Sequence, residues 1–296
     1  MDSSFRSTLK QWSPVIVLLV AMISIQSGAA FAKQLLLTLG VPGTVTLRLS
    51  LAAIILCLIC QPWKRFPSRE AVQWIGLYGL TIAAMNTMIY AAFLYIPLGI
   101  AVALEFLGPL AVAILGSRKK LDFLWVFLAG LGVLLLLPKA DMGNQLPWQG
   151  VLYALGAGVA WALYIVIGQR AGATAPSSMV TTIGILSGAL AVTPIGLANT
   201  GLELFRPQYL PIGLAIAVMS SALPYYLEMV ALKAMPTKTF GVLTSLEPAL
   251  ASLSGMIILH EFLSVIQWLA VICIILASFG AVATSRQPAA TPELGV

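Results

Sequence analysis

The stretch that decides the fold begins as Tyr95-Ile-Pro-Leu-Gly99 and runs on into Leu104-Glu-Phe-Leu-Gly-Pro109. It returns as Ala234-Met-Pro-Thr-Lys238 and Leu243-Thr-Ser-Leu-Glu-Pro248, with both prolines shifted by 139 positions. A passage that recurs at this distance indicates duplication of a unit about half as long as the chain. Each copy also places a glutamate inside an otherwise apolar run, so the repeat predicts two related polar positions in a hydrophobic setting.

The composition is that of an integral membrane protein. Of 296 residues, 60% are hydrophobic and only 9% are charged, whereas soluble domains carry about 25% charged residues. Ten hydrophobic runs of roughly 17 to 23 residues are each long enough to cross about 30 Å of hydrocarbon as a helix. They lack the alternation of polar and apolar residues that a membrane β-barrel requires. The sequence therefore predicts an all-α integral membrane protein with ten transmembrane helices.

The predicted transmembrane runs divide into two groups of five. They cover approximately residues 13–32, 44–60, 71–94, 99–117, 123–138, 148–168, 179–198, 210–232, 239–259 and 263–284. We predict a first five-helix repeat over residues 1–142, a second over 143–286, and a disordered cytoplasmic tail over 287–296. The first run is alternatively a signal peptide, since residues 27–30 imitate a cleavage site, but it is longer than the usual apolar core of one.

The distribution of Lys and Arg predicts the orientation in the membrane. With the N-terminus in the cytoplasm, twelve of the sixteen Lys and Arg fall in segments on the inner side, as the positive-inside rule requires. Both termini are then cytoplasmic and the loop 139–149 is external. Five spans in each half, an odd number, give the two repeats opposite orientations. The net charge of +6 needs no nucleic-acid partner, because these basic residues fix topology and meet anionic lipid head groups.

Three glutamates inside predicted spans are the first candidates for a functional site. Glu105 and Glu247 fall near the middle of the bilayer, about 12 and 16 Å along their helices. A carboxylate at that depth is costly unless it faces the bundle interior, water or a partner, or is protonated. Gly99 and Gly108 near Glu105 would leave room for a ligand, and Glu228 is a weaker candidate nearer the cytoplasm. The alternative is a paired or protonated carboxyl that ties helices together.

Three prolines accompany these acids. The predicted spans place Pro109 and Pro248 in mid-helix, where each would leave the carbonyl four residues earlier without its usual N–H donor. Such breaks occur at membrane depth where the backbone lines a cavity or another helix. Pro224 would do the same to the Ser220 carbonyl, although a kink with packing consequences alone explains this proline equally well.

Two cations and several aromatic side chains complete the candidates. Lys33 and Arg48 flank a predicted outer loop at residues 34–47, with Arg48 just inside the second span. Both could bind a carboxylate of a ligand or close an outer gate onto an acid, while snorkelling to the interface is the alternative. Aromatic residues within spans could form the wall of a cavity, or serve as packing and interfacial anchors. These residues are Tyr90, Trp161, Tyr164, Tyr225 and Tyr226.

Motifs for other chemistries are weak or missing. Cys57 and Cys60 form a C-x-x-C pair without a second cluster, and His260 is the only histidine, so neither a metal nor a redox site is expected. The sequence has no P-loop, no G-x-S-x-G and no dinucleotide fingerprint. We therefore expect no cofactor, no enzyme activity and no ATP-driven pumping by this chain alone. A membrane-embedded enzyme or scramblase would need a catalytic cluster or a polar lipid-facing groove, and the sequence indicates neither.

Two motifs resemble the EamA branch of the drug/metabolite transporter superfamily. They are residues 97–109, and residues 239–250 followed by Gly255 and His260-Glu261. The resemblance extends over nearly the whole chain and implies ten helices in two inverted five-helix repeats. A closer likeness to bacterial inner-membrane exporters of threonine and homoserine lies in residues 20–26, 103–109, 168–172 and 222–229. It implies efflux of small neutral amino acids driven by the proton gradient.

A zwitterionic amino acid would match the candidate side chains. Its carboxylate needs a cationic partner, for which Arg48 is suited, and its ammonium needs an anionic one among the central glutamates. Protonation of Glu105 or Glu247 would weaken the hold on the ammonium and so couple proton uptake to amino-acid release. The resemblance also admits a broader metabolite or drug exporter of the same fold. The expected partners are a small amino acid, protons and membrane lipids, and no pattern in the sequence indicates the oligomeric state.

Overall fold

The computed structural model of this chain describes residues 3–64, 67–115, 121–136, 147–224, 227–228, 231 and 243–284. Every regular element in these ranges is a helix, which confirms the predicted all-α class. Tyr225, Tyr226, most of the loop 139–149 and the predicted tail 287–296 lie outside the described residues.

Five helices in the described part are long and apolar enough to cross a membrane. They are α1 (Ser3–Cys60), α2 (Arg69–Phe93), α6 (Trp148–Thr174), α7 (Ser177–Thr200) and α12 (Val265–Thr284). Shorter helices are α3 (Leu98–Glu105), α4 (Leu107–Leu115), α5 (Asp122–Leu136), α8 (Leu210–Ala217) and α11 (Glu247–Leu259). Three short helical segments also lie in the described part: η1 (Pro62–Lys64) and η2 (Gly201–Phe205) are 3₁₀ helices, and η3 (Val218–Ala222) is a π-helix.

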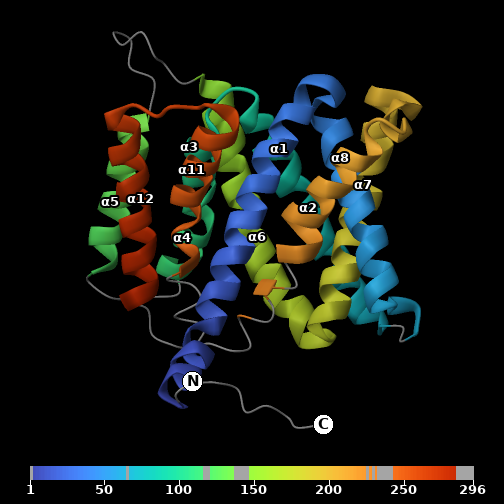
Figure 1. Ribbon diagram of the computed structural model, residues 1–296, viewed down its shortest axis with the longest axis horizontal. Helices are drawn as coiled ribbons and strands as arrows, with labels where there is room; N and C mark the ends of the chain where they lie inside the picture. The colour runs from blue at the N-terminus through green and yellow to red at the C-terminus, as the bar shows by residue number, and fades with distance from the viewer. Residues whose placement is uncertain are drawn as a thin grey trace.

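α1 consists of two helical segments joined by a sharp break at Gly40. This glycine has φ 65° and ψ 179°, a conformation that is essentially restricted to glycine. Pro42 follows at the start of the second segment, where a missing N–H costs little. Figure 1 shows the first segment crossing the molecule and the second returning beside α7. The expectation of a loop over residues 34–47 is therefore wrong, because one glycine is enough to reverse the chain.

The repeated passage forms a break in both halves of the chain. A turn at Phe106 separates α3 from α4, and a turn at Ser245 and Leu246 precedes α11. Phe106 and Ser245 are 139 residues apart, so the break falls at the same place in each copy. Pro109 and Pro248 consequently lie in the first turn of the helix that follows. The expectation of mid-helix prolines is wrong, because the break places them where N–H groups have no acceptor within the helix.

Glycines let these broken helices approach their neighbours, with α3 packed on α11 and α4 on α6. A Cβ on Gly99 would lie 2.6 Å from the Ser252 Cα of α11, and Gly108 faces the Gly158 backbone of α6. A Cβ on Gly158 would lie 2.8 Å from the Glu105 carbonyl oxygen. The expectation that Gly99 and Gly108 leave room for a ligand is therefore wrong, because the space that they provide is filled by adjacent helices.

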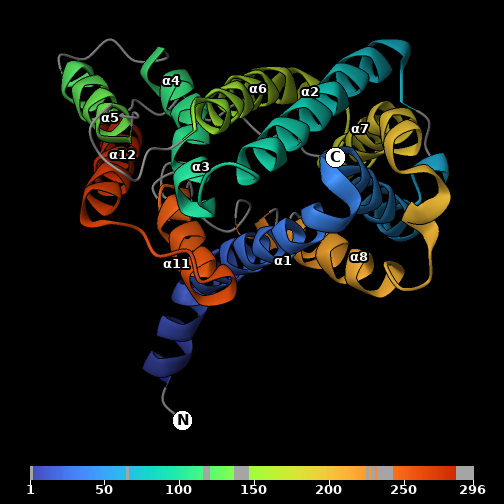
Figure 2. The same ribbon diagram turned by 90° about the horizontal axis from the view of Figure 1, so that it is seen from above.

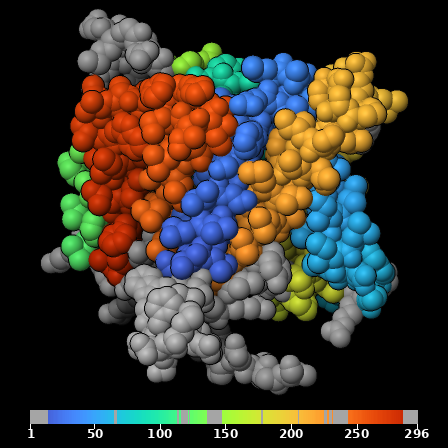
Figure 3. All heavy atoms as spheres, viewed as in Figure 1, coloured from blue at the N-terminus to red at the C-terminus, as the bar shows by residue number. Residues whose placement is uncertain are grey.

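Large apolar side chains cover the outside of the helices. α2 lies along α6 and α7, α1 along α7, and α5 along α12, as Figure 2 shows from above. Phe123, Leu190 and Ile257 are 81%, 65% and 69% exposed on outward surfaces. Figure 3 shows one such surface, on which α12, α11, α1 and α8 lie next to one another. An apolar exterior of this extent is suited to contact with lipid.

The ends of the helices define two faces of the molecule. α1 begins and α12 ends at one face, where α6 also ends and α7 begins; we refer to it as the terminal face, at the bottom of Figure 1. The opposite face, which we refer to as the distal face, carries the break in α1, the start of α3 and the connection 260–264 between α11 and α12. These two faces fix the direction in which a central site opens.

Candidate functional site

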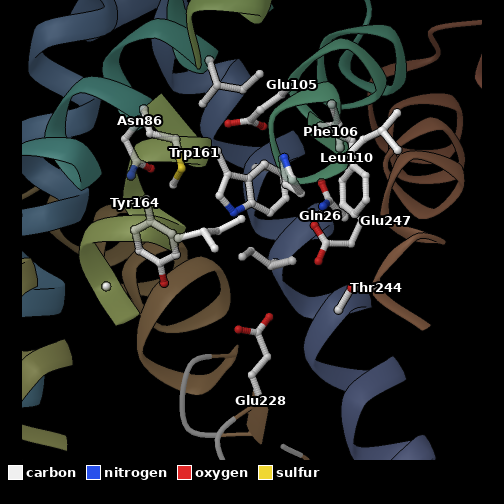
Figure 4. A pocket seen from close by; sticks show the side chains of 18 of the residues that line it. Gln26, Asn86, Glu105, Phe106, Leu110, Trp161, Tyr164, Glu228, Thr244 and Glu247 are labelled. Atoms are coloured by element: carbon white, nitrogen blue, oxygen red, sulfur yellow. The ribbon is translucent and has the colours of Figure 1, made fainter. Parts of the chain in front are cut away.

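A cavity of about 640 Å³ lies between the helices. Its wall is built from α1, α2, α3, α4, α6, α7, α11 and α12 (Figure 4). It reaches Gly172 and Val180, where α6 ends and α7 begins at the terminal face. Toward the distal face it extends to Phe93, the last residue of α2. A cavity of this size is typical of small-molecule binding sites.

All three candidate glutamates lie on the wall of this cavity. Glu105 and Glu247 are buried at 7% and 8% exposure, and Glu228 is half-buried. Figure 4 shows Glu105 and Glu228 toward opposite ends of the cavity, with Glu247 at an intermediate level. None of the three forms a hydrogen bond or ion pair with another described residue. Carboxyl groups in this arrangement are suited to binding protons or a cationic group.

Arg48 is held in the cavity wall by four hydrogen bonds. It lies on the second segment of α1 and is 6% exposed. Nη1 donates to Asn86 Oδ1 at 2.6 Å and to the Tyr90 hydroxyl at 2.9 Å. Nε donates to Ser221 Oγ at 3.2 Å, and Nη2 donates to the Ser220 carbonyl at 3.1 Å. Because a guanidinium has five N–H groups, one N–H on Nη2 has no acceptor within the described part of the chain.

This network differs from a buried ion pair. All four acceptors of Arg48 are neutral, and the ion pairs among the described residues lie elsewhere. The guanidinium also lies 5.3 Å from the centroid of the Tyr90 ring, a cation–π contact. Its positive charge is therefore available to an anionic group in the cavity. Snorkelling, the alternative that the sequence left open, does not fit a side chain enclosed in this way.

Pro224 explains why the Ser220 carbonyl is available to Arg48. A proline cannot donate to the carbonyl four residues earlier. The chain accommodates this with the π-helix η3, in which the Leu223 N–H donates to the Val218 carbonyl, and such π-bulges are frequent at functional sites. Arg48 then supplies a donor to the freed oxygen. The break thus has a polar consequence in addition to any effect on packing.

Aromatic side chains form much of the remaining wall. Trp161 contacts Phe106 edge to face, with ring centroids 5.2 Å apart. The ring centroids of Tyr164 and Tyr78 lie 4.7 Å apart. These four and Tyr90 all line the cavity, so the structure brings the predicted Tyr90, Trp161 and Tyr164 together. Phe106 and Tyr78 were missed in the sequence, where nothing distinguishes them from lipid-facing aromatics.

Sequence reasoning also missed two buried amides on the cavity wall. Asn86 is 3% exposed and Gln26 is 5% exposed, and both line the cavity. Asn86 accepts from Arg48 and donates from Nδ2 to the Ile82 carbonyl at 2.8 Å, so it orients the guanidinium. Each amide lies well inside a hydrophobic run, and a polar residue in that position is the signal that was available.

Lys33 lies outside the cavity lining and forms an ion pair at the distal face. Its Nζ lies 2.6 Å from Glu261 Oε1 and donates to the Ile96 carbonyl at 2.9 Å. Glu261 Oε2 accepts from the N–H of Leu98, the first residue of α3, at 2.8 Å. The pair thus joins α1, α3 and the connection between α11 and α12 at the distal end of the cavity. This geometry fits a gate closed onto an acid and places Lys33 away from a bound ligand.

The described ranges show no arrangement that would hold a metal. No group of three or more His, Cys, Asp or Glu side chains lies together there. Cys57, Cys60 and Cys273 are free thiols, and His260 ends α11 in the left-handed conformation with φ 57°.

Comparison with known proteins identifies the family. The family model of EamA-like transporters matches residues 148–283. Over 296 residues, the full length of both chains, the sequence is 48% identical to the threonine/homoserine exporter RhtA of Escherichia coli K12. This chain belongs to the EamA-like transporter family. The threonine/homoserine exporter RhtA of Salmonella typhimurium LT2 is 49% identical over 279 residues, 94% of each chain.

A solved structure has a similar fold over most of the chain. This crystal structure is 18% identical, has a TM-score of 0.60, and covers 92% of this chain and 97% of its own. At that identity the likeness concerns the fold alone. The family model and the full-length relatives identify the chain as a multi-pass membrane transporter and not an enzyme. The resemblance seen in residues 97–109 and 239–250 is thereby confirmed.

Proposed function

We propose that this EamA-like protein exports small neutral amino acids such as threonine and homoserine across the bacterial inner membrane, by secondary transport coupled to protons. The observation that carries the proposal is one cavity that holds the Arg48 guanidinium together with three carboxyl groups. Among the described residues, none of these carboxyl groups has a hydrogen-bond or ion-pair partner. A zwitterionic amino acid carries the two charges that complement these groups. The names of the full-length relatives, both threonine/homoserine exporters, support the substrate class.

An amino acid fits this cavity through its two charged ends. The carboxylate accepts the remaining Nη2 hydrogen bond of Arg48, and charge-assisted bonds of this kind are strong. Asn86 and Tyr90 already fix the guanidinium, so little side-chain freedom is lost on binding. The ammonium lies toward Glu105 and Glu247, on the facing helices α3 and α11.

Protons act through the same carboxyl groups. An ionised glutamate attracts the substrate ammonium, whereas a protonated glutamate does not. A proton taken up from the outer side would therefore weaken substrate binding and favour release there. Because Glu105, Glu247 and Glu228 are spread along the cavity (Figure 4), the proton can afterwards be passed toward the terminal face. This sequence of steps couples inward proton flow to outward amino-acid flow.

We infer that the structure corresponds to a state that loads substrate from the cytoplasm. We place the terminal face in the cytoplasm on the basis of the twelve-to-four distribution of Lys and Arg. The cavity reaches this face at Gly172 and Val180, and the Lys33–Glu261 ion pair holds the distal end together. Export then requires this ion pair to separate, and the end of α6 and the start of α7 to close the cavity near Gly172.

The proposed topology comprises ten spans in two inverted five-helix repeats, residues 1–142 and 143–286, with both termini in the cytoplasm. The break at Gly40 supports two spans within α1. The equivalent turns at Phe106 and Ser245 support the repeat, and the start of α1 and the end of α12 lie at one face (Figure 1).

Labelling with an impermeant thiol reagent tests this topology in protein lacking Cys57, Cys60 and Cys273. A cysteine in place of Leu202, which is 79% exposed in η2 at the distal face, should be labelled from outside intact cells. A cysteine in place of Ser178, exposed at the start of α7, should be labelled only after permeabilisation. Labelling of both from the same side would contradict the opposite orientation of these two positions.

Counterflow in proteoliposomes tests the substrate class. Vesicles that hold the protein and unlabelled threonine should accumulate labelled threonine and homoserine, because exchange needs only a shared binding site. The aromatic wall of Phe106, Trp161 and Tyr164 favours a second candidate, a broader metabolite or drug exporter. A panel that adds nucleosides and aromatic drugs separates the two. Counterflow of the drugs without counterflow of any amino acid would contradict the first proposal and support the second.

A further inference from the structure

Gln26 is a buried amide that faces the cavity without a hydrogen-bond partner in the described part of the chain. The residue is 5% exposed, lines the cavity, and makes no hydrogen bond with another described residue. Figure 4 shows its side chain on the same side of the cavity as Glu247, and the helices that carry them, α1 and α11, pack against each other. A polar group buried without a protein partner is costly, so the position of this amide favours a ligand that uses it.

The packing of α1 turns Gln26 toward the cavity. Ser24 donates from Oγ to the Met219 carbonyl at 2.8 Å. Gly28 packs so closely that a Cβ there would lie 2.8 Å from the Ser220 Cβ. Both residues therefore face η3. At about 100° per residue, Gln26 is about 160° away from each of them around the helix, so these contacts fix the direction of its side chain.

The chemistry of an amide matches an uncharged hydroxyl. A primary amide offers two donors and an acceptor oxygen, so it can both donate to and accept from a hydroxyl group. The charged ends of an amino acid have charged partners in Arg48 and the glutamates. Asn86, the other buried amide of the wall, is less suited, because it is engaged by Arg48 and the Ile82 carbonyl. Ser278 also lines the cavity, but its hydroxyl oxygen is fully enclosed.

We propose that Gln26 hydrogen-bonds the side-chain hydroxyl of the transported amino acid and so selects hydroxyl amino acids over apolar ones of the same size. The inference rests on the proposed function, since it concerns an amino acid bound between Arg48 and the glutamates. A site that binds a substrate hydroxyl discriminates against the analogue without it, because the buried polar group is then left unpaired. Gln26 is thus a specificity-determining residue.

Two pairs of substrates with matched shapes test the assignment: threonine against valine, and homoserine against norvaline. Counterflow gives a half-saturation concentration and a maximal rate for each. Gln26→Met keeps an unbranched side chain of similar length but removes the amide. The preference for the hydroxyl member of each pair should then fall by about tenfold, as expected when the substrate hydroxyl loses one hydrogen bond. The change should lie in the half-saturation concentrations of threonine and homoserine, while those of valine and norvaline stay the same or fall.

A matched control makes the same chemical change outside the cavity. Gln73 is exposed on α2, so Gln73→Met should leave the preference unchanged. Where Gln26→Met does not reach the membrane, Gln26→Asn replaces it. The shorter side chain keeps the amide but withdraws it from the cavity by one methylene, and the preference should fall in the same direction.

The outcomes separate this inference from the function on which it rests. Wild-type protein that carries neither threonine nor homoserine overturns the proposed function and the role of Gln26 with it. Wild-type protein that carries both, with an unchanged preference in the Gln26 variants, overturns the role of Gln26 alone. An equal loss for all four substrates also overturns it, because such a loss points to the shared part of the substrate or to helix packing.

Discussion

Replacement of Arg48 by methionine should reduce amino-acid transport by at least about 100-fold, the effect expected when one partner of a buried hydrogen-bonded charge pair is removed. The substitution removes the cation that we propose for the substrate carboxylate. It also leaves the acceptors on Asn86, Tyr90 and Ser220 without their donor. Initial rates of counterflow, normalised to protein in the vesicles, measure the loss.

A comparison of ligands separates the binding role of Arg48 from its structural one. The loss should be larger for threonine than for threonine amide, which lacks the carboxylate charge. Arg206→Met is the matched control, because Arg206 is 56% exposed and pairs with Glu203 at the surface, where ion pairs contribute little. An equal loss for the acid and the amide would assign Arg48 to the packing of α1, α2 and η3 and remove it from the binding site.

The sequence was most informative where a pattern is local or repeated. The two copies of the passage around Glu105 and Glu247 indicated a break in the helix. A turn occurs at Phe106 in the first copy and at Ser245 in the second. The position of the prolines relative to the break was wrong, because α4 and α11 begin just before Pro109 and Pro248. Hydrophobic runs indicate where helices lie, but they do not show where hydrogen bonding is interrupted inside a run.

The partners of the candidate residues could not be read from the sequence. Arg48 donates hydrogen bonds to Asn86 and Ser221, which lie 38 and 173 positions further along the chain. Lys33 pairs with Glu261, near the other end of the chain. Such pairs depend on how the helices pack against one another. The sequence does not show this packing, because side chains that face lipid and side chains that face the core are both apolar. For the same reason, the sequence did not show that the space beside Gly99 is filled by α11 and is not free for a ligand.

Replacement of Glu105 by glutamine should abolish export driven by an imposed pH gradient while exchange of labelled for unlabelled substrate persists. Glutamine keeps the size and much of the hydrogen bonding of a protonated glutamate but cannot bind or release the proton. Vesicles with an acidic exterior compartment measure the driven flux, and equal pH on both sides measures exchange. Loss of the protein from the membrane would instead support a helix-tying role for Glu105.

The same substitution at Glu247 should give a different result, because the two carboxyl groups have different electrostatic neighbours. Arg48 acts on Glu105, whereas Glu105 and Glu228 act on Glu247. A proton at Glu105 therefore changes the charge next to the cation that we propose for the substrate carboxylate, so Glu105→Gln should impair gradient-driven export more strongly. The control is Glu203→Gln, since Glu203 is 55% exposed in its surface pair with Arg206. This variant should leave gradient-driven export and exchange unchanged. Wild-type gradient-driven export in both glutamine variants would exclude Glu105 and Glu247 from coupling and leave Glu228 as the remaining carboxyl group of the cavity.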